Sequence, residues 1–467
     1  MTGKRDFLVG KRVTVIGLGV EGIDVARYAA AHGAAAVIVA DDKPREALAE
    51  RMQELEGHPI RYELGAGRTG QLPDSDIVFV SQGVPLSHPA IAGARERGIP
   101  VSSMTRYFLE QCPGPTIGVT GSSGKTTTTS LIAAMLAADG RAHRMGGNIG
   151  TGLLGLLDRM DERTWTVLEI SHTQLALLDR SPHIATVLNV TPNHLDQFTW
   201  DEYVALKQNI VRHQVTGDFA VLNADHEVSA AMADLTPARA SWFSLGDEVP
   251  GDGAFVRDGA VFLRRDSVEE MVLPVAEIPL RGSHNVANVL AAAATAACAD
   301  VPTEIIARAI RAFQPVPHRL EVVAEVGGVT YVNDSIATTP ERTLAGIRSF
   351  SQPLVLLLGG KDKDLPKDEL AQEALARCHS IVFFGADGAL LEAAVEANAA
   401  SVPFEDRPTT ARVVTLAEAV RAASELAEPG DVVLLSPACT SFDAYNNFEE
   451  RGEEFRRLVR AMAPEVR

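Results

Sequence analysis

A glycine-rich segment between an apolar run and a helix-like stretch constrains this chain more than any other feature. Residues 118–129 read Gly-Val-Thr-Gly-Ser-Ser-Gly-Lys-Thr-Thr-Thr-Thr. Glycines let successive backbone N–H groups point into one concavity, and the following helix N-terminus adds the positive end of its dipole. Lys125 can reach the terminal phosphates of a nucleotide, and Thr126 can offer a hydroxyl to Mg²⁺. The segment therefore predicts a phosphate-binding loop and an ATP-using enzyme. The match is imperfect, because Val119 stands where the usual motif has its first glycine, and a plain Gly/Ser turn is the alternative.

Length and composition limit the class of protein. A chain of 467 residues is typical of about three domains. Its apolar stretches are too short to span a bilayer, and the N-terminus has no signal-like apolar segment, so we expect a cytoplasmic protein without a membrane partner. The net charge of −18 argues against nucleic-acid binding. Four dispersed cysteines without C-x-x-C spacing indicate reduced thiols. We expect a monomer.

Short apolar strands alternate with amphipathic helices along the whole chain, a pattern that predicts an α/β fold with parallel sheets. Near the N-terminus, a strand at 12–16 is followed by Gly17-Leu-Gly-Val-Glu-Gly22, a helix, and a second strand ending in Asp41-Asp42. G-x-G-x-x-G with acidic residues about twenty positions later is typical of a dinucleotide-binding Rossmann unit. A nucleotide fold that uses the same turn without redox chemistry is the alternative.

Proline-rich joints divide the chain into three predicted domains. The first joint is Cys112-Pro-Gly-Pro115, and the second is Gln314-Pro-Val-Pro317, in which two prolines exclude a helix. We predict a Rossmann-like domain at 1–112, a central P-loop ATPase-like domain with a parallel sheet at 113–313, and a C-terminal Rossmann-like α/β domain at 314–467. Strands are expected at 166–170 and 184–190 in the central domain, and at 354–358, 380–384 and 432–435 in the last one.

Acidic and imidazole side chains follow the central strands, at the sheet edge where open α/β sheets bind ligands. Glu169 ends one strand, and His194 and Asp196 follow another. Taken alone, an acidic residue at such a position is more often a surface carboxylate than a ligand, and a histidine is more often an ordinary loop residue. Together with Lys125 they can complete a magnesium–phosphate site, since Mg²⁺ prefers oxygen ligands. Lys207, on a helical pattern, is by its spacing alone a solvated helix lysine.

The motifs together resemble the Mur ligase family of peptidoglycan synthesis, most closely its MurD type, over essentially the full chain. In the central domain the matching segments are 120–127, 147–150, 168–171, 189–196 and 282–288. In the last domain they are 317–321, 333–335, 359–363, 435–443 and 447–449. The C-terminal Ser-Pro-Ala-Cys and Asn-Phe-Glu sequences point to the glutamate-adding branch.

The resemblance implies an ATP-dependent ligase that joins D-glutamate to UDP-N-acetylmuramoyl-L-alanine through an acyl-phosphate. The first domain would bind UDP rather than NAD. The implied UDP-substrate residues are Gly19, Val20, Glu21, Asp41, Asp42, Ser81, Asn148 and Ser171. Those implied for ATP are Gly121, Ser123, Gly124, Lys125, Thr126, Thr127, Asn288, Arg319 and Asp334.

The resemblance also implies a catalytic and metal centre with two Mg²⁺ ions. Thr126, Glu169, His194 and Lys207 would ligate the ions, Lys207 as a carbamate that turns a cation into a carboxylate. Lys125, Glu169, His194 and Lys207 would be the catalytic residues. Glutamate would lie among Thr338, Lys363, Ser441 and Phe448, with Lys363 supplying a point charge for the dicarboxylate.

Three departures from the family pattern bear on the amino-acid acceptor and on the metal site. Ile336 stands where the family usually has a lysine, His172-Thr173 replace a Ser-Phe pair, and Asn193 replaces an acidic residue. A positive charge is therefore missing near the glutamate and phosphate end, which leaves L-glutamate or another amino acid as an alternative acceptor. A nicotinamide dehydrogenase and a P-loop switch protein are the alternatives outside the ligases.

Overall fold

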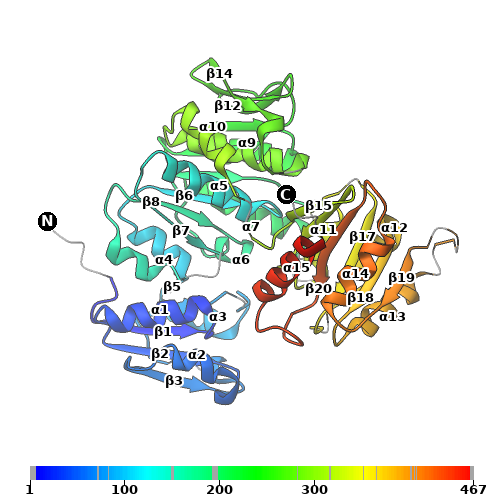
Figure 1. Ribbon diagram of the computed structural model, residues 1–467. Coiled ribbons are helices and arrows are strands. Elements are labelled where there is room, and N and C mark those ends of the chain that lie inside the picture. Colours follow the sequence, from blue (N-terminus) through cyan, green and yellow to red (C-terminus); the bar gives the residue numbers. More distant parts are fainter. Residues whose placement is uncertain are drawn as a thin grey trace. The chain divides into compact units, whose positions relative to one another are not determined.

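The computed structural model describes residues 7–462 except 71–72, 83, 149–151, 192–197, 281, 315–316, 351, 364, 400–401, 404 and 406. The chain divides into two compact units, Met1–Phe313 and Gln314–Arg467. The first unit, coloured blue to green in Figure 1, contains two sheets, and the second contains one. The predicted domain limits at 112/113 and 313/314 stay predictions.

The first sheet has five parallel strands in the order β3-β2-β1-β4-β5. This is the order of a Rossmann-like half-sheet, and it places the glycine turn after β1 at the carboxyl edge. The strands are β1 (Arg12–Ile16), β2 (Ala36–Asp41), β3 (Ile60–Leu64), β4 (Ile77–Val80) and β5 (Val101–Ser102). The helices are α1 (Val20–Ala31), α2 (Ala49–Gln53), α3 (Pro89–Glu96) and α4 (Met104–Gln111), with short 3₁₀ helices η1 (Arg45–Leu48) and η2 (Arg68–Gly70).

The central sheet has nine strands in the order β14-β13-β12-β11-β10-β9-β6-β8-β7. Its strands are β6 (Thr116–Thr120), β7 (His143–Gly147), β8 (Trp165–Glu169), β9 (Ile184–Val187), β10 (Phe219–Asn223), β11 (Arg239–Ser244), β12 (Gly253–Arg257), β13 (Ala260–Arg265) and β14 (Val268–Pro274). Strands β6 to β12 pair with one another in parallel, whereas β13 pairs antiparallel with both β12 and β14. The sequence pattern did not predict this antiparallel extension. The prediction relied on strands that alternate with helices, and no helix separates β12, β13 and β14.

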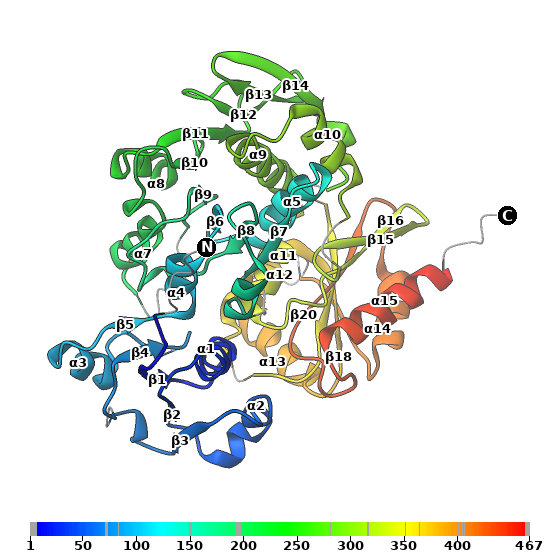
Figure 2. The same ribbon diagram turned by 90° about the vertical axis from the view of Figure 1, so that its left-hand side faces the viewer.

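Helices cover the faces of the central sheet, as Figure 2 shows from a second direction. They are α5 (Lys125–Ala138), α6 (His172–Leu175), α7 (Trp200–Arg212), α8 (Glu227–Ala230), α9 (Ser283–Cys298) and α10 (Thr303–Ala312), with 3₁₀ helices η3 (Leu154–Arg159), η4 (Ala231–Leu235) and η5 (Val275–Glu277). Helix α5 packs against α9 and α10. The fully buried strand β6 lies between β8 and β9, so the loop that follows it emerges at the middle of the carboxyl edge.

The sheet of the second unit has the order β15-β16-β20-β17-β18-β19. Its elements are β15 (Glu321–Val326), β16 (Val329–Asn333), α11 (Pro340–Ile347), β17 (Leu354–Gly359), α12 (Asp368–Arg377), β18 (Cys378–Phe384), α13 (Gly388–Asn398), β19 (Thr409–Arg412), α14 (Leu416–Leu426), β20 (Val432–Ala438) and α15 (Phe448–Met462). Among the strands that the structure describes in this unit, only β15 and β16 pair antiparallel, joined by Gly327 and Gly328 with φ of +61° and +81°. Two successive positive φ angles suit a two-residue hairpin turn.

The predicted α/β fold is confirmed in all three sheets. Strand β9 ends at Val187 rather than at the predicted Val190, because the next residues turn to hold the glycine-rich loop. All four cysteines are free thiols. In the described part of the chain, no helix is both long and apolar enough to cross a membrane.

Candidate active site

The glycine-rich loop lies where the sequence predicts it, between β6 and α5. Gly124 caps α5 with a φ of +81°, and a Cβ there would lie 2.2 Å from Asn288 Oδ1. Gly121 faces Leu188, whose Cβ would lie 2.9 Å from an added Cβ. Only glycine fits these two positions without a shift of the surroundings. The predicted ATP residue Asn288, on α9, therefore lies directly against the loop.

Asn189 holds the loop to the end of β9. Its side-chain oxygen accepts a hydrogen bond from Ser123 N at 2.9 Å, and its amide nitrogen donates to Ser123 O at 3.3 Å. Its backbone oxygen accepts from Ser122 N at 2.9 Å. Sequence reasoning noted Asn189 only as part of a motif. An asparagine two residues after β9, the strand that neighbours the loop strand β6, was the signal for this role.

Lys125 lies in the first turn of α5 and folds back over the loop. Its ammonium group donates to Gly121 O at 2.9 Å and to Ser122 O at 3.2 Å. Thr127 lies in the same first turn. The positive charge is thus held at the loop, close to the backbone N–H groups at the helix N-terminus that suit a phosphate.

A hydroxyl and a carboxylate meet beside the loop. Thr126 Oγ1 donates to Glu169 Oε2 at 2.7 Å, and Asn148 Nδ2 donates to Glu169 Oε1 at 2.9 Å. Glu169 ends β8 and is buried, which places its carboxylate at the carboxyl edge of the sheet. His194, Asp196 and Asn193 lie outside the described residues. Among the residues that are described, no group of three His, Cys, Asp or Glu side chains could hold a metal ion.

Lys207 is buried beneath the loop, with only 1% of its surface exposed. Its Nζ donates to Thr120 Oγ1 at 3.1 Å and to Gly121 O at 3.2 Å. Burial lowers the pKa of Lys207 well below its ordinary value, the charge of Lys125 lowers it further, and Glu169 opposes the shift. The solvated helix lysine expected from spacing alone is therefore wrong, because the helix turns this residue toward the end of β6.

The glycine turn of the first sheet is tightly packed. A Cβ on Gly22 would lie 2.1 Å from Gly17 O, so the first turn of α1 approaches the strand end closely. Asp41 accepts hydrogen bonds from Leu18 N at 2.8 Å and Lys43 N at 2.9 Å, which ties β2 to the turn. Asp42 accepts from Thr69 Oγ1 at 2.7 Å, and this hydrogen bond lowers the pKa of Asp42.

A buried hydroxyl faces the same turn. Ser81, directly after β4, is 4% exposed, and its Oγ has no hydrogen-bond partner among the described residues. A Cβ added to Gly19 would lie 2.9 Å from this oxygen. Gly19 caps α1, and Val20 beside it is exposed. A ligand with oxygen atoms that reaches the turn would meet an unsatisfied hydroxyl and a helix N-terminus.

Side chains join the first sheet to the central one. Both carboxylate oxygens of Glu21 accept hydrogen bonds, one from Gln174 Nε2 at 2.6 Å and the other from Gln82 N at 3.2 Å. Gln82 Nε2 donates to Ser171 Oγ at 3.0 Å and to Asn148 Oδ1 at 3.2 Å. Burial raises the pKa of Glu21. The predicted substrate residues Glu21, Ser171 and Asn148 thus belong to one network, which the sequence spacing did not reveal.

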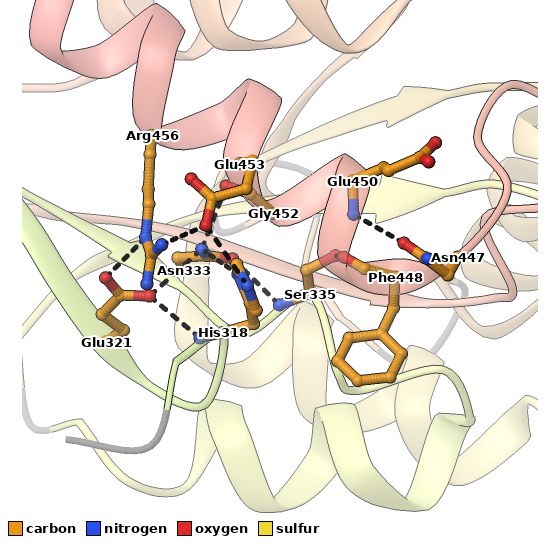
Figure 3. A network of polar contacts seen from close by, with 10 residues as sticks. All are labelled: His318, Glu321, Asn333, Ser335, Asn447, Phe448, Glu450, Gly452, Glu453 and Arg456. Atoms are coloured by element: carbon orange, nitrogen blue, oxygen red, sulfur yellow. Dashed lines mark hydrogen bonds and ion pairs between the residues drawn. The ribbon is translucent and has the colours of Figure 1, made fainter.

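In the second unit, the strand ends and α15 are joined by polar contacts that Figure 3 shows. His318 N donates to Glu321 Oε2 at 2.9 Å, and Arg456 Nε donates to Glu321 Oε1 at 2.7 Å. The ring nitrogen Nδ1 of His318 lies 3.0 Å from Asn333 Nδ2. Ser335 Oγ donates to Phe448 O at 2.8 Å. The predicted glutamate residue Phe448 is therefore fixed to the loop that follows β16.

Arg451 is a buried cation that sequence reasoning missed. It is 1% exposed and donates to Ser335 O at 2.9 Å and to Cys439 O and Thr440 O at 3.1 Å. Burial lowers its pKa to about 10. One guanidinium thereby joins the loops after β16 and β20, and the second of these loops carries the buried predicted residue Ser441.

Asp334, predicted to contact ATP, is buried within the same unit. Its carboxylate accepts from Ser436 Oγ at 2.8 Å and from Leu320 N at 3.2 Å. Burial raises its pKa to about 7, while these hydrogen bonds and the charge of Arg319 oppose the shift. Arg319 thus lies within electrostatic reach of Asp334.

Family models match a segment within each of the three sheet-containing parts of the chain. Residues 11–103 match the Mur ligase MurD-like N-terminal domain, 119–296 the Mur ligase middle domain, and 318–439 the Mur ligase glutamate ligase domain. A UDP-N-acetylmuramoylalanine–D-glutamate ligase of Koribacter versatilis is 41% identical over 456 residues, which cover 97% of this chain and 98% of that protein. The chain belongs to the Mur ligase family. A ligase with the same description from Symbiobacterium thermophilum is also 41% identical, with 97% and 98% of the two chains covered.

Solved structures of other Mur ligases share the fold. UDP-N-acetylmuramate–alanine ligase MurC of Thermotoga maritima aligns with a TM-score of 0.54 at 17% identity, covering 97% of this chain and 99% of that one. A pseudomurein peptide ligase type C of Methanothermus fervidus aligns with a TM-score of 0.55 at 15% identity, covering 97% and 100%. At this identity the likeness shows the three-domain Mur ligase fold alone.

Proposed function

We propose that this Mur ligase joins D-glutamate to UDP-N-acetylmuramoyl-L-alanine with the hydrolysis of ATP to ADP and phosphate. The observation that carries the proposal is a phosphate loop with Lys125 at its mouth, Thr126 bound to Glu169, and Lys207 buried beneath it. The ligases from Koribacter and Symbiobacterium, at 41% identity over nearly their whole length, support this choice of substrates.

The residues around the loop fit a magnesium–nucleotide complex. Thr126 and Glu169 present oxygen atoms 2.7 Å apart beside the phosphate cradle, and Mg²⁺ prefers oxygen ligands. In the proposed site these two residues, His194 and a carbamylated Lys207 would hold two Mg²⁺ ions. When bound, the ions would neutralise charge on the phosphates as the substrate carboxylate approaches.

Lys125 stabilises charge during phosphoryl transfer. The alanine carboxylate of the UDP-substrate attacks the γ-phosphorus of ATP, the bond to the bridging oxygen breaks, and ADP leaves. An acyl-phosphate results. Negative charge develops on the transferred oxygens, and Lys125, held at the loop by two backbone oxygens, supplies a fixed positive charge to them.

The glutamate amine then attacks the activated carbonyl carbon. A C–N bond forms, the C–O bond to phosphate breaks, and the amine loses a proton, which leaves an amide and inorganic phosphate. In this proposal Asn288, Arg319 and Asp334 contact ATP, while Thr338, Lys363, Ser441 and Phe448 surround the glutamate. Lys363 Nζ already donates to Thr338 Oγ1 at 3.4 Å, and its charge suits a dicarboxylate acceptor.

Lys207 is proposed to work as a carbamate. Its low pKa favours the neutral amine, which is the form that reacts with carbon dioxide, and the product carries a carboxylate-like charge. The glycine turn, Asp41, Asp42 and Ser81 of the first sheet are proposed to bind the UDP portion. The unsatisfied buried hydroxyl of Ser81 supports an oxygen-bearing ligand at that turn.

The test is phosphate release from ATP with UDP-N-acetylmuramoyl-L-alanine and D-glutamate, L-glutamate or no amino acid. We expect release that depends on both substrates and is fastest with D-glutamate. Release that depends on L-glutamate alone would establish the alternative acceptor. ATP hydrolysis that needs neither substrate would indicate a switch protein. Lys125→Ala should abolish release while the far-ultraviolet circular dichroism stays unchanged, and a variant that keeps near-normal release would refute the ATP site.

A further inference from the structure

Two cationic side chains converge on one tight turn in the second unit. The turn Ile336–Thr338 is closed by a hydrogen bond from Thr338 N to Ile336 O at 2.9 Å. Arg342 Nη1, from the first turn of α11, donates to Ile336 O at 3.2 Å. Lys363 Nζ donates to Thr338 Oγ1 at 3.4 Å. The guanidinium and the ammonium group are thus both held at residues of the same three-residue turn.

Neither cation forms an ion pair with a carboxylate within 4.0 Å among the described residues. Arg348, at the end of the same helix α11, differs: it pairs with Glu369 at 3.2 Å and Glu373 at 2.7 Å. Partial desolvation lowers the pKa of Lys363, and the charge of Arg342 lowers it further. The two positive charges therefore repel each other, and an anion bound between them would relieve that repulsion.

Asp334, a buried carboxyl group whose pKa the charge of Arg342 lowers, is a poor counter-charge. It is 5% exposed, and its two oxygens accept hydrogen bonds from Ser436 and from the backbone of Leu320. Burial raises its pKa to about 7, so a large share of Asp334 is neutral near that pH. Arg342 is exposed and keeps N–H donors beyond the one that contacts Ile336.

Backbone hydrogen bonds join this turn to the other proposed acceptor loops. Ala438 N donates to Ala337 O at 3.0 Å, which connects the end of β20 to the turn. Lys361 N and Thr440 N each donate to the other residue's carbonyl oxygen at 3.0 Å, which connects the loop of Lys363 to the loop of Ser441. The two cations and the buried Ser441 hydroxyl thus belong to one connected edge of this sheet.

We propose that Arg342 binds a carboxylate of the amino-acid acceptor, together with Lys363. The inference rests on the proposed ligase function and adds a residue to its acceptor site. Ile336, where the family usually has a lysine, carries no charge, and Arg342 supplies a positive charge at the backbone of that same position. A guanidinium can hold a carboxylate by two parallel hydrogen bonds. An arginine in place of the usual lysine therefore restores the positive charge and also changes the geometry by which the carboxylate is recognised.

Steady-state kinetics of Arg342→Gln, Arg342→Lys and Arg348→Gln test the proposal. Gln keeps a hydrogen-bond donor for Ile336 O but loses the charge, whereas Lys keeps the charge. We expect Arg342→Gln to raise the KM for D-glutamate about tenfold to a hundredfold, as expected for loss of a hydrogen bond to a charged group. The KM values for ATP and UDP-N-acetylmuramoyl-L-alanine should stay unchanged. Arg342→Lys keeps the charge but not the two parallel hydrogen bonds, so it should recover only part of the glutamate affinity, and Arg348→Gln should match the wild type.

Each failure has its own signature. A wild-type chain without glutamate-dependent phosphate release overturns the proposed function, and this inference with it. A working wild-type enzyme whose Arg342→Gln variant keeps the same KM for glutamate overturns the inference alone. An equal rise in all three KM values would show a merely structural role for Arg342, and would overturn the inference as well.

Discussion

At the scale of single residues, the burial of Lys207 is the observation with the most chemical content. A buried ammonium group normally requires a carboxylate partner, because removing its charge from water is costly. The hydrogen-bond acceptors of Lys207 are instead a hydroxyl and a carbonyl, and the positive charge of Lys125 lowers its pKa more than the charge of Glu169 raises it. The position therefore suits a neutral amine or a modified, negatively charged side chain better than a cation.

Lys207→Ala should remove nearly all ligase activity. If the side chain is a carbamate that faces magnesium, its loss removes an attractive charge interaction of about 4 kcal/mol at an effective dielectric of 20, or roughly a thousandfold in rate. Acetate can enter the vacated space and should restore part of the rate. Arg212→Ala, on the exposed end of the same helix α7, is the control and should stay active. A fully active Lys207→Ala enzyme would eliminate the carbamate.

Asp334 predicts a pH dependence of stability. Its pKa is raised to about 7 from an ordinary 3.8, chiefly by burial. Well below pH 3.8 both the folded and the unfolded state hold this proton, so the Asp334 carboxyl group costs the protein no stability there. As the pH rises toward 7 the unfolded state ionises first, and stability is lost, on the order of 4 kcal/mol in total above pH 7.

The comparison that isolates this effect is urea unfolding of the wild type and of Asp334→Asn between pH 4 and 8. Asparagine does not titrate, so the variant should gain stability relative to the wild type as the pH rises through this range. If the variant also hydrogen-bonds differently to Ser436, that difference changes its free energy of unfolding by the same amount at pH 4 and at pH 8. Two curves that run parallel across the range would contradict the raised pKa.

At the scale of elements, the junction of β6 and α5 depends on glycine. Gly124 has a φ of +81°, and a Cβ added to it would point at the side chain of Asn288 on α9. Gly140, just past the other end of α5, has a similar φ of +74° but no atom within 4 Å of an added Cβ. These two glycines share the backbone strain that alanine would meet and differ in the space around them.

Gly124→Ala should therefore harm the protein more than Gly140→Ala. Both variants should lose about 1 kcal/mol because alanine is disfavoured at positive φ. Gly124→Ala must in addition displace Asn288, so we expect a further loss of stability and a phosphate-release rate reduced by at least about tenfold. Thermal unfolding and the phosphate assay measure the two effects. Equal behaviour of both variants would mean that the contact with Asn288 does not matter.

At the scale of the whole molecule, each of the three sheets carries several of its predicted ligand residues at the carboxyl ends of its strands. In the first sheet Asp41 is the last residue of β2, and Ser81 directly follows β4; in the central sheet Lys125 and Thr126 lie in the loop and helix start after β6, and Glu169 is the last residue of β8. In the last sheet they follow β16, β17 and β20. This agrees with the general rule for open α/β sheets. The chain should consequently be stabilised by ligands of more than one class.

Ligand-dependent unfolding distinguishes a UDP site from a nicotinamide site. A ligand at one hundred times its dissociation constant stabilises the native state by about 2.7 kcal/mol. UDP-N-acetylmuramoyl-L-alanine and a non-hydrolysable ATP analogue should each raise the unfolding temperature, and NADH should not. Tight NADH binding in a fluorescence titration would favour the dehydrogenase alternative for the first sheet.

The order of local patterns determined the phosphate loop, the glycine turn after β1, the strand that ends in Glu169, and the family. These features could be predicted because they depend on residues adjacent in sequence: a strand, a turn and a helix N-terminus. The tertiary structure alone decided the burial of Lys207 against Thr120, the contact of Asn288 with Gly124, and the approach of Arg342 and Lys363 to one turn. The contacts of Lys207, Asn288 and Lys363 join segments far apart in sequence, and periodicity shows only that a helix has two faces, not which element covers each one.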